Sequence, residues 1–118
     1  MKRKNAILLL TFTLCTQFIY SQSDSRGDLS IYVSNGNITV SNSGSENIEY
    51  SFTYKVSRYD KDGNVLDSYE RTKSGCIKGN KTQPFVVTAP EAPYGSGQKN
   101  KFTDIAITKA STTNQTCW

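Results

Sequence analysis

The sequence contains no histidine. This absence excludes Ser-His and Cys-His catalytic pairs, histidine metal ligands and a histidine pH switch. The sequence also lacks a glycine-rich phosphate loop ahead of a helix, and its carboxylates are scattered along the chain. Because an active site needs such groups gathered together, we predict that the protein is not an enzyme and has neither a cofactor nor a metal site.

A long hydrophobic run occurs only near the N-terminus, where Lys2, Arg3 and Lys4 precede an apolar stretch over 6–14. This order predicts a secretory signal peptide over 1–21, cleaved after the small residue Ser21. The stretch is shorter than the roughly 20 residues of a membrane-spanning helix, so we expect no stable membrane insertion. Leu14 stands where a lipidated Cys15 would need a small residue, which argues against a lipid anchor.

The mature chain has little net charge. Of the 14 basic residues, three belong to the leader, so 11 basic residues face 10 acidic ones over 22–118. The signs alternate along the sequence and form no basic stripe, so we expect no nucleic-acid partner.

Cysteine is scarce as well. Cys15 belongs to the leader, which leaves Cys76 and Cys117 in the mature chain. Exported proteins meet an oxidising environment, so we predict a disulfide between these two. Two free thiols are the alternative.

No window carries apolar residues at helical spacing, whereas alternation with a period of two is common and predicts strands. The clearest case is 48–57, whose apolar face is Ile48, Tyr50, Phe52, Tyr54 and Val56. Asn35-Gly36 predicts a hairpin between 28–34 and 37–42. Further strands are expected over 65–73, 85–87 and 102–109, with Leu66 or the pair Val65 and Tyr69 facing inward on the first, and Ile105 and Ile107 sharing a face on the last.

Six or seven short strands separated by turns predict one all-β domain over 22–118, a small antiparallel immunoglobulin-like β-sandwich. A small barrel is the alternative. Ser74-Gly75 is expected to end the strand that begins at Val65, and the proline-containing segment 89–97 is expected to be a loop. Residues 110–118 are interpreted as a mostly polar tail after the last strand. Most aromatic residues are assigned to the core, while four could form an exposed binding face: Tyr32, Tyr59, Tyr69 and Tyr94.

Three short motifs favour ordinary explanations. Asp60, Asp62 and Asn64 have the spacing of a calcium loop, but Arg71 stands where a bidentate acid is needed, so we interpret them as a turn. Arg26-Gly27-Asp28 matches an integrin-recognition tripeptide, and we interpret it as part of a flexible N-terminal lead. Sequons begin at Asn37, Asn80 and Asn114 and matter only if the source glycosylates exported proteins.

The segment 50–87 has a recognisable order: a tyrosine-rich strand from Tyr50, the turn Asp62-Gly63-Asn64, a polar strand ending in Ser74-Gly75, and the short strand 85–87. It resembles the periplasmic curli assembly inhibitors, the family that contains CsgC and CsgH. The resemblance implies an immunoglobulin-like sandwich in the periplasm that keeps amyloid-forming subunits from nucleating. Extracellular or cell-surface placement is the alternative.

On this interpretation the partner is an amyloid-forming protein subunit, and we expect the free protein to be a monomer. The hypothesis for client binding rests on basic side chains expected on two adjacent central strands: Lys55, Arg58, Arg71 and Lys73. The alternative function is a structural or adhesive immunoglobulin-like module without chaperone activity.

Overall fold

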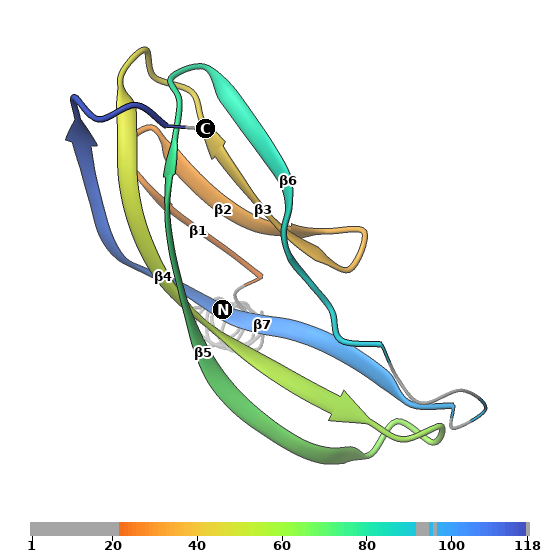
Figure 1. Cartoon of the computed structure of the whole chain (residues 1–118). Helices are drawn as coiled ribbons and strands as arrows, with labels where there is room; N and C mark the ends of the chain where they lie inside the picture. Colours follow the sequence, from red (N-terminus) through yellow and green to blue (C-terminus); the bar gives the residue numbers. More distant parts are fainter. Residues whose placement is uncertain (1–21, 92–94, 96, 118) are drawn as a thin grey trace, which may run out of the picture.

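The computed structural model describes residues 22–91, 95 and 97–117, and the predicted signal peptide lies outside them. The described chain is all β, with strands β1 Ser23–Arg26, β2 Leu29–Ser34, β3 Asn37–Asn42, β4 Asn47–Tyr59, β5 Val65–Ile77, β6 Lys81–Thr88 and β7 Lys99–Thr113 (Figure 1). No helix within these ranges is long and apolar enough to cross a membrane.

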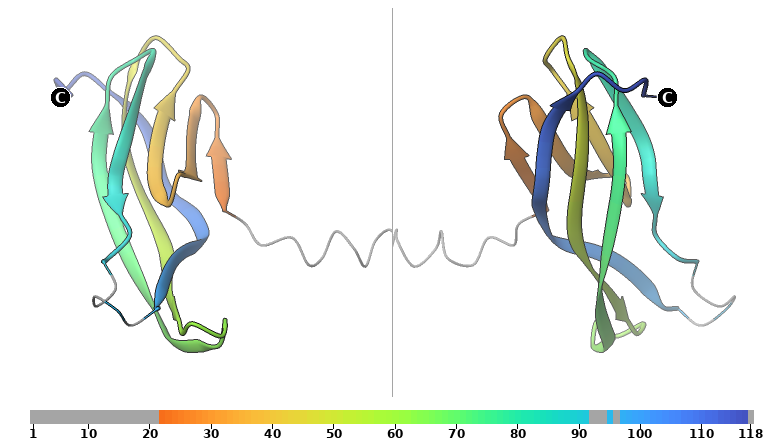
Figure 2. Two further views of the ribbon diagram at one scale, coloured as in Figure 1. Left: turned by 90° about the vertical axis from the view of Figure 1, so that its right-hand side faces the viewer. Right: turned by 60° about the vertical axis from the view of Figure 1, so that its left-hand side comes forward.

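The strands form two antiparallel sheets. The first sheet has the order β1-β2-β3-β6 and the second has the order β5-β4-β7. Their facing sides share one hydrophobic core, which confirms the predicted all-β sandwich. The strands of the second sheet are 13 to 15 residues long, against four to eight in the first. The second sheet therefore extends well beyond the first at the end that holds the β4–β5 turn (Figures 1 and 2).

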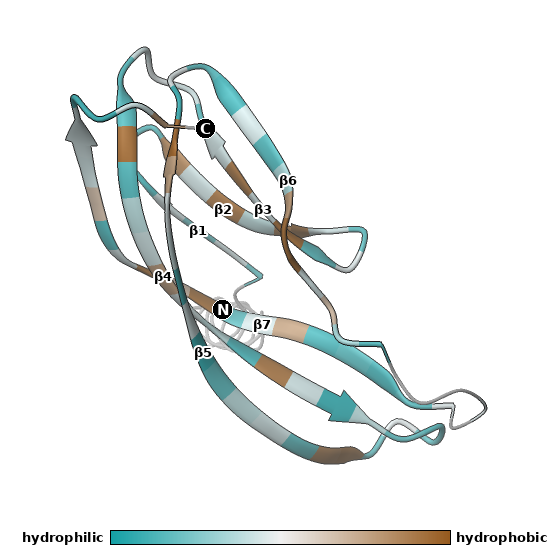
Figure 3. Ribbon diagram, in the orientation of Figure 1, coloured by the Kyte–Doolittle hydropathy of each residue, from teal (hydrophilic) through white to brown (hydrophobic). Residues whose placement is uncertain are grey.

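Strand β4 provides the centre of the core. All five residues of its predicted apolar face are buried, and Figure 3 shows hydrophobic and polar bands alternating along it. The rings of Tyr50, Phe52 and Tyr54 follow one another at 6.0 and 5.7 Å, and Tyr54 meets Phe102 edge to face at 5.5 Å. The first sheet covers them with Leu29, Ile31, Ile38 and Val40.

The predicted β2–β3 hairpin is confirmed. Asn35 and Gly36 both have positive φ, 52° and 75°, as a two-residue turn that follows the strand twist requires.

Strand β7 carries two irregularities that change which residues face inward. Its pairing with β4 shifts beside Tyr54 and again beside Phe52. Asp104 has a positive φ of 54° at the first shift, as in a β-bulge. Phe102 therefore shares the buried face with Ile105 and Ile107 although its position is even and theirs are odd.

Four expectations at the strand level are wrong. The lead before Asp28 is not irregular, because 23–26 pairs with β2. The tail is strand up to Thr113, since β4 continues far enough to pair with it. β6 begins at Lys81 rather than 85, and Pro84 is tolerated there because an edge strand can lose one donor. β5 does not end at Ser74-Gly75 but runs to Ile77, paired with β4 throughout.

The inward residues expected for β5 are also corrected. Val65 is 59% exposed and Leu66 is 47% exposed, while Tyr69 is half-buried. The register shifts at Leu66, and this end of the second sheet extends past the first, so little covers these side chains.

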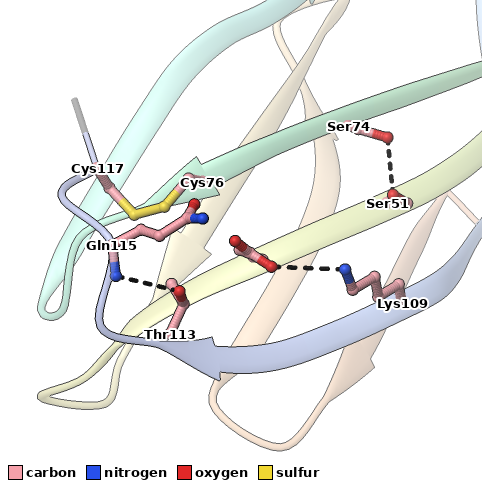
Figure 4. A network of polar contacts seen from close by, with 8 residues as sticks. Ser51, Ser74, Cys76, Lys109, Thr113, Gln115 and Cys117 are labelled. Carbon is pink, nitrogen blue, oxygen red and sulfur yellow. Dashed lines mark hydrogen bonds and ion pairs between the residues drawn. A yellow bond between two sulfur atoms is a disulfide. The ribbon is translucent and has the colours of Figure 1, made fainter.

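Cys76 of β5 and Cys117 form a disulfide with their Cα atoms 5.2 Å apart, as predicted (Figure 4). Cys117 is fully buried, and the side chain of Asn47 donates to the carbonyl of Gln115 at 2.9 Å. The C-terminal tail is thus fixed across the end of the second sheet. A disulfide fits an exported protein, because reducing compartments keep thiols free.

Candidate functional site

The edges of the two sheets differ in how far a further strand could pair with them. An edge strand exposes unpaired backbone N–H and C=O groups, and natural proteins usually block them. The four edge strands are β1, β6, β5 and β7.

Strands β1 and β7 block each other. The carboxylate of Asp24 accepts a hydrogen bond from the N–H of Ile107 at 2.7 Å. The guanidinium of Arg26 donates to the carbonyl of the same residue at 2.9 Å. Both backbone groups of Ile107 are thereby satisfied beside a β-bulge, and the two sheets are held together along this side.

Strand β6 is interrupted in its middle. Three residues, Pro84, Phe85 and Val86, lie opposite the single residue Thr39 of β3. Pro84 has no backbone donor, and Phe85 takes a φ of 61° with its side chain 62% exposed. A bulge of this kind bends the edge away from a regular ladder.

Strand β5 remains open. Its pairing with β4 is regular from Ile77 to Asp67, without a register shift. Nine of its residues over 65–74 are exposed, on both faces, and the tenth is the half-buried Tyr69. Within the described ranges, β5 is the edge strand with the longest uninterrupted register. It has neither a proline nor a bulge between Asp67 and Ile77, and its one register shift lies at Leu66 near its start.

The two faces of β5 differ in chemistry. The face on the core side carries Asp67, Tyr69, Arg71 and Lys73, which lie beside Arg58, Val56, Tyr54 and Phe52 of β4. The outer face carries Ser68, Glu70, Thr72 and Ser74, beside Ser57, Lys55, Thr53 and Ser51. Ser51 and Ser74 share a hydrogen bond of 2.7 Å across the strands (Figure 4).

Arg58 and Asp67 form a two-pronged ion pair, with N–O distances of 2.6 and 2.7 Å. The hydrogen bonds from Arg58 lower the pKa of the Asp67 carboxyl, and the same bonds raise the pKa of Arg58. Arg71 lies over the ring of Tyr69 at 4.8 Å from its centroid, a cation–π contact. Burial raises the pKa of the neighbouring Tyr54 phenol, while Arg71 opposes that shift.

A groove runs along the core-side face of β5. It has a volume of about 430 Å³ and is lined by Arg58, Asp67, Tyr69, Arg71, Pro90, Glu91, Gln98 and Asn100. Asn100 donates from its side-chain amide to the carbonyl of Pro90, which ties β7 to the segment after β6. Both signs of charge line the groove, beside the half-buried ring of Tyr69. We call the strand and this groove together the β5 edge.

Of the four basic residues predicted to bind a client, Arg58, Arg71 and Lys73 share the core-side face, whereas Lys55 lies on the outer face. β5 is an edge strand, not the central strand expected. Glu91 was not among the residues predicted from the sequence, because it follows Pro90 in a segment far from β5 along the chain. The sequence signal for an edge was the polar run over 67–74, where neither alternating face is apolar.

The residues of the other motifs take part in local turns and hydrogen bonds. One oxygen of the Asp60 carboxylate accepts from the N–H groups of Asp62 and Asn64 at 2.9 and 2.8 Å. In the described chain, no group of three Cys, Asp or Glu residues is placed to hold a metal ion. Arg26 of the integrin-type tripeptide is bonded to Ile107, and Gly27 with Asp28 forms the β1–β2 turn.

The remaining candidates lie apart from the β5 edge. Asn80 and Asn114 of the sequons are exposed and Asn37 is half-buried. Tyr32 and Tyr59 are half-buried, and Tyr94 lies outside the described residues.

Comparisons with protein-family models, with curated proteins and with solved structures give no match to this chain.

Proposed function

We propose that this protein is a non-catalytic binding protein of the periplasm that pairs through its β5 edge with an extended segment of an amyloid-forming subunit and delays fibre assembly. The expected client is a curli-type subunit, on the resemblance of the segment 50–87 to curli assembly inhibitors.

The observation that carries the proposal is the open β5 strand. An extended peptide can add to such an edge through backbone hydrogen bonds, with side-chain pockets supplying selectivity. Amyloid grows by the same backbone pairing, so a strand held against β5 has one side capped by a folded domain. A capped strand cannot template the next subunit on that side.

The charges along β5 select among possible clients. Arg71 and Lys73 lie on the groove side and are both exposed, while Arg58 is already paired with Asp67. An incoming strand with carboxylates or amide side chains at alternate positions would meet these two cations. A strongly basic strand would be disfavoured.

The test is the lag time of fibre formation by a curli-type subunit, followed by thioflavin T fluorescence with substoichiometric mature protein. The wild type should lengthen the lag. The double variant Arg71→Gln, Lys73→Gln should lose most of this effect, because it removes both exposed cations from the groove side.

Lys55→Gln is the matched control, since it removes a cation of the same sheet that lies on the outer face one strand from the edge. It should inhibit like the wild type. If the double variant and the wild type give equal lag times, the groove-side cations are not the contact. If the wild type itself gives no delay, the structural or adhesive alternative replaces the proposal.

A further inference from the structure

We infer that β5 also pairs with β5 of a second copy of this chain, antiparallel and centred on Tyr69. This goes beyond the proposed function and departs from the monomer expected from the sequence. It rests on the charge pattern of the open strand and does not depend on any client.

The pattern on the core-side face is self-complementary about Tyr69. In an antiparallel pair centred on this residue, Asp67 of each copy lies opposite Arg71 of the other, so two ion pairs flank a Tyr69–Tyr69 contact. On the outer face Ser68 lies opposite Glu70, which brings no like charges together. The exposed side chain of Leu66 would lie opposite Thr72 and lose part of its contact with water.

Centring on Ser68 brings no like charges together but forms no ion pair, because Asp67 then lies opposite Tyr69. The two registers on the other side of Tyr69 are worse. Centring on Glu70 places two carboxylates directly opposite each other, and centring on Arg71 does the same with two guanidinium groups. Like charges in directly opposed positions destabilise a strand pair. Of these four registers, the one centred on Tyr69 is therefore the one that forms ion pairs without opposing like charges.

Arg58 of β4 would belong to the same cluster of opposite charges. Asp67 is already held by Arg58, and a carboxylate has about four lone-pair sites, so it can accept from a second arginine as well. The regular part of the pairing covers few residues on each copy. The interface is accordingly smaller than the roughly 1,000 Å² of a stable complex, and the dimer should form only at high protein concentration.

The experiment is sedimentation equilibrium of the mature protein alone, without a client, over a series of concentrations. The wild type should show a monomer–dimer equilibrium. Asp67→Lys and Arg71→Glu should each weaken it by at least about tenfold, because each places like charges opposite one another at two symmetric positions. Circular dichroism should show that both variants keep the β-fold.

Mixing the two variants provides the decisive sample. In a mixed pair, Lys at 67 faces Glu at 71 and Arg71 faces Asp67, so dimers should reappear at concentrations at which each variant alone is mostly monomeric. Lys73→Glu is the control, because position 73 lies opposite Val65 in this register and its dimer should be as strong as the wild type's.

Three results would overturn the inference: a wild type that stays monomeric at the highest concentration, a mixture that stays monomeric, or a Lys73→Glu variant that loses the dimer while Arg71→Glu keeps it. None of them bears on fibre lag time, so self-pairing and client binding can fail separately.

Discussion

At the residue scale, the phenol of Tyr50 occupies the space above Gly75 on the neighbouring strand. A Cβ atom added at Gly75 would lie 2.5 Å from the Tyr50 hydroxyl oxygen. Tyr50 is buried between the sheets, and burial raises the pKa of its phenol. A strand can therefore pass through Ser74-Gly75, and glycine here marks a close approach of a side chain rather than a turn.

We predict that Gly75→Ala lowers the free energy of unfolding by about 1–3 kcal/mol, because the Tyr50 ring must shift within a packed core. Urea unfolding followed by tyrosine fluorescence measures the change. Gly63→Ala tests backbone strain instead of packing, since Gly63 has open space around it and a φ of 86°. Equal stability of Gly75→Ala and the wild type would contradict the packing account.

Asp60 gives a prediction about pH. The backbone N–H of Asn64 and its other hydrogen-bond donors lower the pKa of this carboxyl in the folded protein. Its stabilising effect is thus present above the unfolded pKa of about 3.9 and is lost as the pH falls through the lower folded value.

Asp60→Asn removes this titration and should reduce the loss of stability on acidification. Urea midpoints at about pH 7 and about pH 3 measure it in both proteins. The pKa of Asp67 is also lowered in the folded protein, and Asp67 remains in the variant. The variant should therefore still lose some stability at low pH. A larger loss of stability in the variant than in the wild type would count against the assigned role.

At the element scale, alternation predicted the strands whose inner face is apolar and failed for the polar ones. β4 and the β2–β3 hairpin have clear patterns because one face of each is buried. β1 consists of Ser23, Asp24, Ser25 and Arg26, so its pairing depends on β2 and on contacts with β7 that no local pattern reveals. The bulge at Asp104 likewise arises from the partner strand's register.

The contact between β1 and β7 yields the third prediction. Asp24→Ala leaves the N–H of Ile107 without its charged acceptor, so we expect a loss of about 1–3 kcal/mol in the free energy of unfolding. Ser25→Ala is a control on the same strand, because the hydroxyl of Ser25 contacts Ser30 of β2 rather than β7. Amide exchange at Ile107 should accelerate in Asp24→Ala and stay unchanged in the control, and unchanged exchange in both would show that the contact does not protect this edge.

At the scale of the whole molecule, the spacing of strands and turns predicted the sandwich and the cysteine count predicted its disulfide, while the β5 edge could not be predicted. The sequence holds the charges of β5, but the order β5-β4-β7 and the greater length of the second sheet decide that they face a groove. Grouping Lys55 with Arg71 and Lys73 failed to separate the two faces of the sheet, because the strands had not been placed in register.

The disulfide should contribute strongly to overall stability. It joins residues 41 positions apart, and the loss of chain entropy in the unfolded state corresponds to about 3–4 kcal/mol. The double variant Cys76→Ser, Cys117→Ser should be less stable by about that amount in urea unfolding. Adding a reductant should lower the stability of the wild type but not that of the variant. Equal stability of the wild type and the double variant would show that fixing the tail contributes little to the free energy of unfolding.

The central claim is that β5 is an open edge that accepts a strand, and amide hydrogen exchange tests it most directly. In the free, dilute protein, every second amide over 67–75 should exchange fast, because it points away from β4. With an amyloid-forming subunit present at concentrations that delay fibres, these same amides should become protected. Delayed fibres with unchanged exchange along β5, or with new protection elsewhere in the chain, would contradict the account.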